Sequence, residues 1–167
     1  MNYIEIELFE RKIRFYDENH IELEFKNKKD NWKPVSINSS RKHKYKTIYV
    51  SKYGFTYIIL VHRLVFYSHN PSWDFYDVSK DNVIDHIDGN KQNNSITNLQ
   101  CVSNQENSFN RKKAKGYSWC KRYKKWRSKI QVNRKSIHLG YFDNEEDARN
   151  AYLEGKKKYH IIKPRVF

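Results

Sequence analysis

The residues of this chain that could do chemistry gather between Val83 and Asn107. Asp85 stands directly before His86, a turn rich in Gly and Asn follows, and Asn98 comes shortly before the end of the stretch. The oxygens of Asp and Asn suit a hard cation, and histidine is the side chain best suited to take a proton near neutral pH. Together these residue types predict a small site for one metal ion.

Hydrolysis of a phosphodiester bond would use such groups together. A general base takes a proton from the attacking water, which is worth roughly 10²–10⁴ in rate. A divalent ion stabilises the charge that develops at phosphorus and on the leaving oxygen. Mg²⁺ keeps several waters and needs few protein ligands, so one histidine and two oxygen ligands are enough. The stretch therefore predicts a phosphodiesterase site with one metal.

Local patterns indicate which elements must position these groups. Val83-Ile84 predicts a short strand that leads into the acid–histidine pair, and residues 98–102 predict a second strand. Ser103 and Glu106 have the spacing of a capping box, so a helix is expected from residue 104 to about residue 113. That helix is poor in apolar residues, and we infer that it rests partly on the metal site or on DNA.

The segments that carry a family resemblance are His86–Asn90, Asn93-Asn94, Asn98-Leu99, Glu106-Asn107 and, upstream, Val61–Val65. They closely resemble the motif of the HNH homing endonucleases of phages and group I introns, which share the ββα-metal fold. The resemblance implies that His86 is the general base and that Asp85 and Asn107 are metal ligands. It also implies that Asn98 is the central structural residue, which ties the loop to backbone.

Asn107 is where the chain departs from the motif, because many relatives carry histidine there. An amide oxygen favours a hard ion, so Mg²⁺ or Mn²⁺ is expected instead of Zn²⁺. His62 is expected to be structural, although it could line the cleft. Asn93 and Asn94 are expected to be turn residues and not ligands. Arg111, on the same face of the expected helix as Asn107, could bind a phosphate or remain solvated.

The N-terminal part of the chain predicts antiparallel strands. Residues 3–9 and 21–25 alternate acidic and apolar side chains, which is typical of half-buried strands, with a turn at residues 17–19 between them. Residues 32–34 are expected to break the chain, and residues 36–44 to form a basic loop.

A hairpin and a short helix are expected next. The hairpin strands are predicted at residues 46–50 and 55–61, around Tyr53-Gly54. The helix is predicted over residues 62–67, and Asn70-Pro71 ends it.

Positive charge is concentrated in the C-terminal part. The chain has 167 residues and carries 33 Lys and Arg against 19 acids, a formal charge of +14, yet residues 1–24 are net acidic. Residues 111–138 contain twelve Lys or Arg and no acid. A basic surface of this kind attracts polyanions, so nucleic acid is the expected partner.

Three strands and a helix are expected in this basic part. The strands are predicted at residues 117–119, 126–132 and 136–142, and a helix should run from the acidic signal at 143–146 to about Tyr159. Polar and basic residues alternate with apolar ones along the second and third strands. One face of the sheet can therefore meet DNA in a major groove while the other packs under the helix.

Trp126, Ile137–Phe142 and Glu146–Ala148 lie in a segment, residues 115–160, that resembles the DNA-binding domain of the plant Apetala and ethylene-response factors. Several arginines of the plant proteins are absent, so their target sequence does not transfer. The resemblance implies that Lys125, Lys129, Gln131 and His138 face DNA. The full set of candidate DNA-binding residues is Arg111, Trp119, Lys121, Arg122, Lys125, Arg127, Lys129, Gln131, Arg134 and His138.

Other classes of protein fit the sequence less well. No apolar run approaches the roughly 18 residues of a membrane-spanning helix, and the acidic N-terminus lacks a signal-peptide pattern. Cys101 and Cys120 form no close pair, so they support neither a disulfide framework nor a cysteine zinc site. A cytoplasmic protein, encoded by a phage in a bacterial host, is expected.

The expected fold class is α+β, with N-terminal antiparallel strands leading into a ββα-metal HNH core, plus a small three-stranded sheet packed on one helix. The expected domains are residues 1–113, with the core at about 83–113, then 116–160 as the Apetala-like domain and 161–167 as a tail. The expected function is a sequence-directed endonuclease that nicks or cuts double-stranded DNA, as a monomer, with Mg²⁺ or Mn²⁺. The alternatives are a DNA-binding regulator with an inactive HNH fold and an RNA-binding protein.

Overall fold

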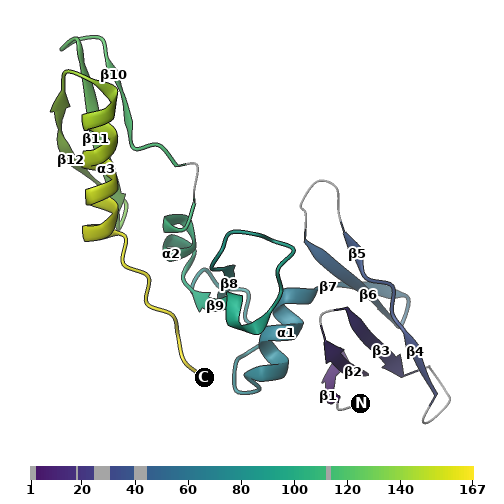
Figure 1. The fold of residues 1–167 in the computed structure, drawn as a ribbon. Coiled ribbons are helices and arrows are strands. Elements are labelled where there is room, and N and C mark those ends of the chain that lie inside the picture. Colours follow the sequence, from purple (N-terminus) through teal and green to yellow (C-terminus); the bar gives the residue numbers. More distant parts are fainter. Residues whose placement is uncertain (1–2, 18, 25–30, 40–44, 112–113) are drawn as a thin grey trace. The chain divides into compact units, whose positions relative to one another are not determined.

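The structure, a computed structural model, describes residues 3–17, 19–24, 31–39, 45–111 and 114–167. It divides into a first unit, Met1–Cys101 with Arg165–Phe167, and a second unit, Val102–Pro164. More of the described residues lie in β-strands than in α-helices, as Figure 1 shows. In the described part of the chain, no helix combines the length and the apolar character that a membrane crossing requires.

A four-stranded antiparallel sheet begins the first unit, in the order β1-β2-β3-β4. Its strands are β1 (Ile4–Leu8), β2 (Arg11–Asp17), β3 (His20–Glu24) and β4 (Trp32–Pro34). The strands expected at residues 3–9 and 21–25 are confirmed as β1 and β3. The pattern analysis missed β2, which pairs with both of them and buries Ile13 and Phe15.

The prediction of a chain break at residues 32–34 is wrong, because these residues form strand β4. Pro34 is tolerated there because β4 lies at the edge of the sheet, where a missing N–H breaks no ladder on the outer side. The expected basic loop at 36–44 contains the short strand β5 (Asn38–Ser39), and its residues 40–44 lie outside the described residues.

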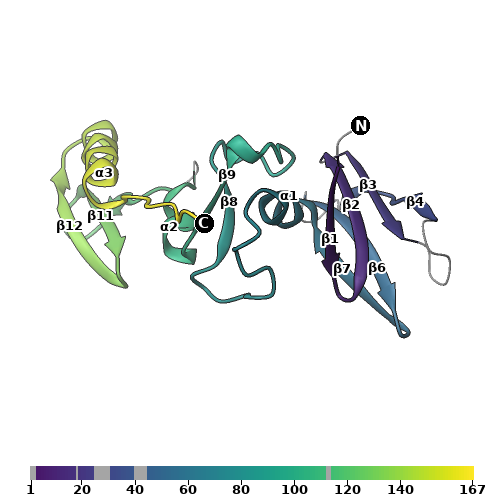
Figure 2. The same cartoon turned by 90° about the horizontal axis from the view of Figure 1, so that it is seen from below.

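The expected hairpin is confirmed as β6 (Lys46–Lys52) and β7 (Phe55–Leu60). Tyr53 and Gly54 both have positive φ, 50° and 81°, which is the backbone of a tight hairpin turn. The short helix is also confirmed, as α1 (Val61–His69). It contacts β6 and β7 on one side and β8 on the other, so it connects the hairpin to the motif stretch (Figures 1 and 2).

The segment between α1 and the motif is anchored by Arg63. Its guanidinium donates to the carbonyls of Phe75 (2.6 Å) and Asp77 (3.2 Å) and lies 4.6 Å from the ring centroid of Trp73. Trp73 is almost fully buried, and its indole N–H donates to the side-chain oxygen of Asn82. These contacts fix the chain directly before the motif strand.

The motif stretch forms two paired strands, β8 (Val83–His86) and β9 (Leu99–Val102), with a 3-10 turn, η1 (Ile96–Asn98), before the second. Helix α2 (Asn104–Phe109) follows in the second unit. The predicted capping box of Ser103 and Glu106 is confirmed, with both reciprocal bonds present. The helix ends at Phe109, however, and not near residue 113 as predicted.

The second unit contains a three-stranded antiparallel sheet of β10 (Tyr117–Cys120), β11 (Lys125–Val132) and β12 (Lys135–Phe142), covered on one face by α3 (Glu145–Tyr159) (Figures 1 and 2). All four elements were expected. Ser128 and Ile130 of β11 are buried on the face toward α3. Gly155 lets the helix approach closely, since a Cβ there would lie 2.8 Å from the Leu139 side chain.

Candidate active site

The acid–histidine pair lies at the end of β8, inside the first unit. Asp85 and His86 are only 8% and 4% exposed. The Ile87 N–H donates to the Asn98 carbonyl (2.9 Å), and the Gly89 N–H donates to the His86 carbonyl (2.8 Å). Strand pairing and a tight turn therefore fix the backbone positions of Asp85 and His86.

The Asn98 side chain ties the loop between the two strands. Its Oδ1 accepts from the Asp88 N–H (3.0 Å), and its Nδ2 donates to the Asp88 carboxylate (3.0 Å) and to the Asn93 carbonyl (2.8 Å). The Asn93 amide also donates to Asp88 (2.8 Å). These bonds, with one from the Asn90 N–H, hold the pKa of Asp88 below its ordinary value, and the bond from Asn93 contributes most.

His86 is held by Asn94. The distance from His86 Nε2 to Asn94 Oδ1 is 3.0 Å, and the Asn94 side chain is 1% exposed. The sequence analysis expected Asn94 to be a turn residue, so this contact was missed. Two consecutive asparagines in a Gly- and Asn-rich stretch are an ordinary turn signal, and the only other hint was their place among the residues of the family resemblance.

His62 lies beside His86 as well. The two rings are 5.0 Å apart between centroids and 70° apart in plane, an edge-on contact, and the Tyr45 ring lies 5.1 Å from His62. Burial lowers the pKa of His62 to about 3, with smaller effects from His86, Arg63 and Lys91. His62 is therefore neutral at physiological pH. Within the described residues its Nδ1 has no hydrogen-bond partner.

Asp85 accepts a hydrogen bond at Oδ2 from the Gln100 amide (3.0 Å), so the neighbouring strand β9 orients the carboxylate. Among the described residues, no group of three or more His, Cys, Asp and Glu side chains could hold a metal ion. The donor set at this position is instead one carboxylate beside imidazole and amide groups. Mg²⁺ and Mn²⁺ are hard ions that prefer oxygen ligands, and Mg²⁺ keeps several waters and takes only one or two protein carboxylates, so the carboxylate of Asp85 would fit such an ion.

Asn107 lies on α2, half-buried, in the second unit. The structure thus brings Asp85, His86 and Asn98 together in the first unit and places Asn107 in the second. The prediction that Arg111 shares a helix face with Asn107 is wrong. Helix α2 stops at Phe109 with Asn110 as its C-cap, and the exposed Arg111 follows the helix.

The other candidate residues lie on or around the sheet of the second unit. On β11 and β12, Lys129, Gln131 and His138 are exposed, and Lys129 pairs with His138 across the two strands. Arg127 and Lys125 are half-buried, and Lys125 forms an ion pair with Asp143 (3.1 Å). The remaining candidates, Trp119, Lys121, Arg122 and Arg134, are exposed. Since α3 covers the opposite face, the expected division into a polar face and a packed face is present.

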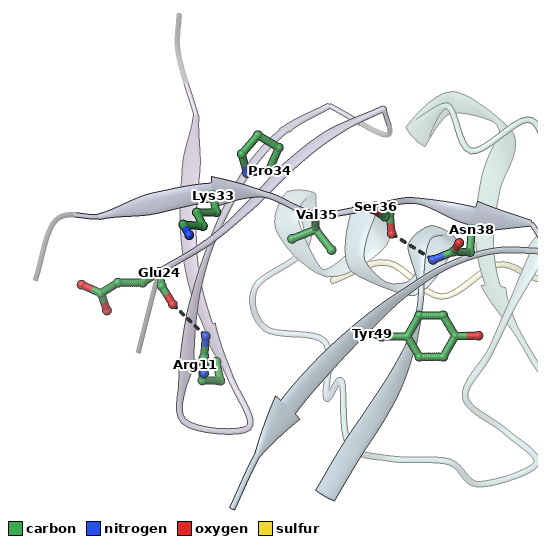
Figure 3. Close-up of a pocket in the computed structure, with 8 residues that line it drawn as sticks. All are labelled: Arg11, Glu24, Lys33, Pro34, Val35, Ser36, Asn38 and Tyr49. Atoms are coloured by element: carbon green, nitrogen blue, oxygen red, sulfur yellow. Dashed lines mark hydrogen bonds between the residues drawn. The ribbon is translucent and has the colours of Figure 1, made fainter. Parts of the chain in front are cut away.

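A cavity of about 350 Å³ opens in the first unit, and Figure 3 shows the residues that line it. Arg11, Lys33 and Tyr49 are among them, and the Arg11 guanidinium donates to the Glu24 carbonyl (2.7 Å). None of the residues that line this cavity belongs to the motif stretch or to the predicted site.

Comparison with known proteins gives a family match for the central stretch. Residues 60–109 match the HNH endonuclease family. They run from the end of β7 through α1, β8 and β9 to the end of α2, so the similarity to this family covers these elements. The match ends at residue 109 and does not reach the sheet of the second unit.

One relative is similar over part of its length. It is the protein named "SPbeta prophage-derived putative HNH homing endonuclease YosQ" of Bacillus subtilis (strain 168), 44% identical over 50 residues. The match covers 30% of this chain and 26% of the relative, so it spans about a quarter of the relative's length. A comparison with the solved structures gave no match.

Proposed function

We propose that this chain is a sequence-directed DNA endonuclease of the homing type, which hydrolyses phosphodiester bonds in double-stranded DNA with one divalent ion, Mg²⁺ or Mn²⁺. The observation that carries the proposal is the buried pair Asp85 and His86 at the end of β8, oriented by Gln100 and Asn94, within the segment that matches HNH endonucleases.

In this proposal the imidazole of His86 takes the proton of the attacking water. Asp85 and Asn107 would hold the ion, an assignment that rests on the sequence motif. The ion, when bound, stabilises the charge on the phosphate and on the leaving oxygen. Asn98 holds the loop through its hydrogen bond to Asp88. The rings of His62 and Tyr45 pack beside His86.

The second unit would hold the DNA. It contains 17 Lys and Arg against 6 acids, which accounts for +11 of the formal +14 of the chain. Its exposed sheet face presents Lys129, Gln131 and His138, and a major groove can accept a small sheet of this kind. The phosphate contacts would supply affinity, and the polar side chains of the face would read base edges.

Incubation of the full chain with supercoiled DNA of a phage or bacterial host tests the proposal. With Mg²⁺, a protein that acts as a monomer with one site should convert supercoiled DNA to open circles, and a chelator should stop the reaction. Linear product without open circles would instead indicate paired cutting. If Mg²⁺ and Mn²⁺ both gave no conversion, with any DNA offered, the proposed nuclease function would be contradicted.

A further inference from the structure

The hydrogen bond between His86 and Asn94 determines which nitrogen of the imidazole carries the proton. An amide oxygen can only accept a hydrogen bond, so the His86 Nε2 that lies 3.0 Å from Asn94 Oδ1 must be the protonated nitrogen of the neutral ring. Nδ1 is then the nitrogen with the lone pair. A ring protonated on Nδ1 instead of Nε2 could not donate this bond.

Among the described hydrogen bonds, the Asn94 side chain takes part in the one to His86. The loop is closed by Asn98 and Asn93 through Asp88, without a contribution from the Asn94 side chain in the described hydrogen bonds. Asn94 is 1% exposed, and within the described residues its Nδ2 has no hydrogen-bond partner. A buried amide with an unsatisfied donor is an unfavourable way to fill space, which favours a role that depends on its oxygen.

The surroundings of His86 support the same role. His62 contacts the ring edge-on, and its low pKa, caused chiefly by burial, keeps it uncharged beside His86. Packing against His62 and Tyr45 restricts the position of the ring, but aromatic contacts do not distinguish one tautomer from the other. The Asn94 oxygen supplies that distinction.

We infer that Asn94 is a positioning residue, which holds the His86 imidazole as the Nε2–H tautomer so that Nδ1 takes the proton of the attacking water. The inference rests on the proposed function for the second half of this statement, whereas the tautomer itself is a property of the folded chain. In the reaction the water loses its proton to Nδ1, the ring becomes an imidazolium, and Nε2–H remains bonded to Asn94 throughout.

Long-range ¹H–¹⁵N NMR correlation of the ¹⁵N-labelled full chain tests the tautomer directly, at a pH of about 8, where an ordinary imidazole is neutral. The His86 signals are identified by their loss in the His86→Gln variant. We expect the pattern of an Nε2–H ring in the wild type. A ring protonated on Nδ1 would overturn the inference, whether or not the protein cuts DNA.

Three variants then test the consequence. Asn94→Leu keeps the approximate shape and removes the accepting oxygen, Asn94→Asp keeps an oxygen, and Asn90→Leu is the matched control at an exposed asparagine of the same loop. Asn94→Leu should lose the single Nε2–H pattern and lower kcat about tenfold or more with KM nearly unchanged, as outer partners of catalytic groups typically do. Asn94→Asp should retain the tautomer and more of the rate, and Asn90→Leu should resemble the wild type.

The outcomes separate the inference from the proposed function. If the wild type cuts DNA and Asn94→Leu cuts equally fast with the same tautomer, the inference fails and the nuclease stands. If the wild type cuts no DNA, the proposed function fails, and the NMR spectra still decide whether Asn94 sets the His86 tautomer. Should Asn94→Leu not fold, the wild-type spectrum and Asn94→Asp carry the test.

Discussion

Phe109 of helix α2 stacks face to face on His160, with ring centroids 3.9 Å apart and planes 8° apart. The backbone N–H of Lys163 donates to Glu106 of the same helix (3.0 Å), and the Gln105 and Asn133 side chains are hydrogen-bonded (2.8 Å). A six-residue helix is too short to be stable alone. The helix that carries Asn107 therefore takes support from the C-terminal sheet and from the segment after α3, whereas the expected support from a metal site or DNA stays a prediction.

This support predicts that α2 depends on residue 160. His160→Ala should expose the buried face of Phe109 and speed amide hydrogen exchange in α2 by up to about tenfold, because an aromatic pair of this kind is worth about 0.5–1.5 kcal/mol. His160→Phe keeps the stacking and should exchange like the wild type. Equal protection of α2 in the alanine variant would contradict the packing argument.

The three hydrogen bonds of the Asn98 side chain predict a large loss of stability when this residue is substituted. Asn98→Ala removes three hydrogen bonds inside the loop, each worth about 1 kcal/mol net, so the free energy of unfolding should fall by about 2–3 kcal/mol. Asn90→Ala, which removes one exposed turn bond to the Gln92 N–H, should cost well under about 1 kcal/mol. Urea denaturation of both variants gives the two free energies of unfolding. Similar losses would show that the Asn98 hydrogen bonds do not stabilise the loop more than the single bond of Asn90.

His62 predicts a dependence of stability on pH. Its pKa is about 3 in the folded chain against an ordinary 6.5, so below pH 6.5 the unfolded chain binds a proton that the folded chain does not. Stability should therefore be complete above pH 6.5 and fall as the pH drops toward 3, by about 2–3 kcal/mol at two pH units below 6.5.

The control for His62 is a ring of similar size without a titratable nitrogen. His62→Phe should flatten the part of the pH–stability curve that lies between 6.5 and 3, measured by urea denaturation at successive pH values. If both proteins lost stability in parallel, another group would be responsible for the acid sensitivity.

The exposed face of the second unit predicts which lysines contact DNA. Lys129→Ala should weaken binding to every sequence and reduce the slope of log affinity against log salt by about 1, the value for one phosphate contact. Lys157 is the matched control, since this exposed lysine lies on helix α3, which covers the other face of the sheet, and it pairs with Glu154 (2.7 Å). Fluorescence anisotropy across a salt series measures both, and an equal effect of Lys157→Ala would reject the assigned face.

Local signals in the sequence predicted much of the fold. Some features depend only on residues that are close together in the chain, and these could be predicted from the sequence. They are the capping box at Ser103, the Tyr53-Gly54 hairpin and the alternation along β11 and β12. Strand β2 was missed because its preceding turn is made by Phe9 and Glu10 at positive φ, without a glycine to mark it. The end of α2 was misplaced because its stability comes from distant residues.

The candidate site shows the same limit. Asp85, His86 and Asn98 could be found from residue types and spacing, because a motif preserves both. The contact between His86 and Asn94 depends on how the loop closes across eight residues, and the contact between His62 and His86 depends on where α1 packs. Neither side-chain direction follows from the sequence pattern, so only the three-dimensional structure shows the groups that surround the base.

The most direct test of the nuclease is the cleavage rate of His86→Ala at saturating protein, measured with supercoiled DNA and Mg²⁺ beside a binding measurement on the same DNA. Loss of the general base should slow cleavage by about 10²–10⁴, while the affinity for DNA stays within about twofold, since the basic sheet lies in the second unit. Cleavage by His86→Ala at the wild-type rate would contradict the central claim that this buried histidine activates the water.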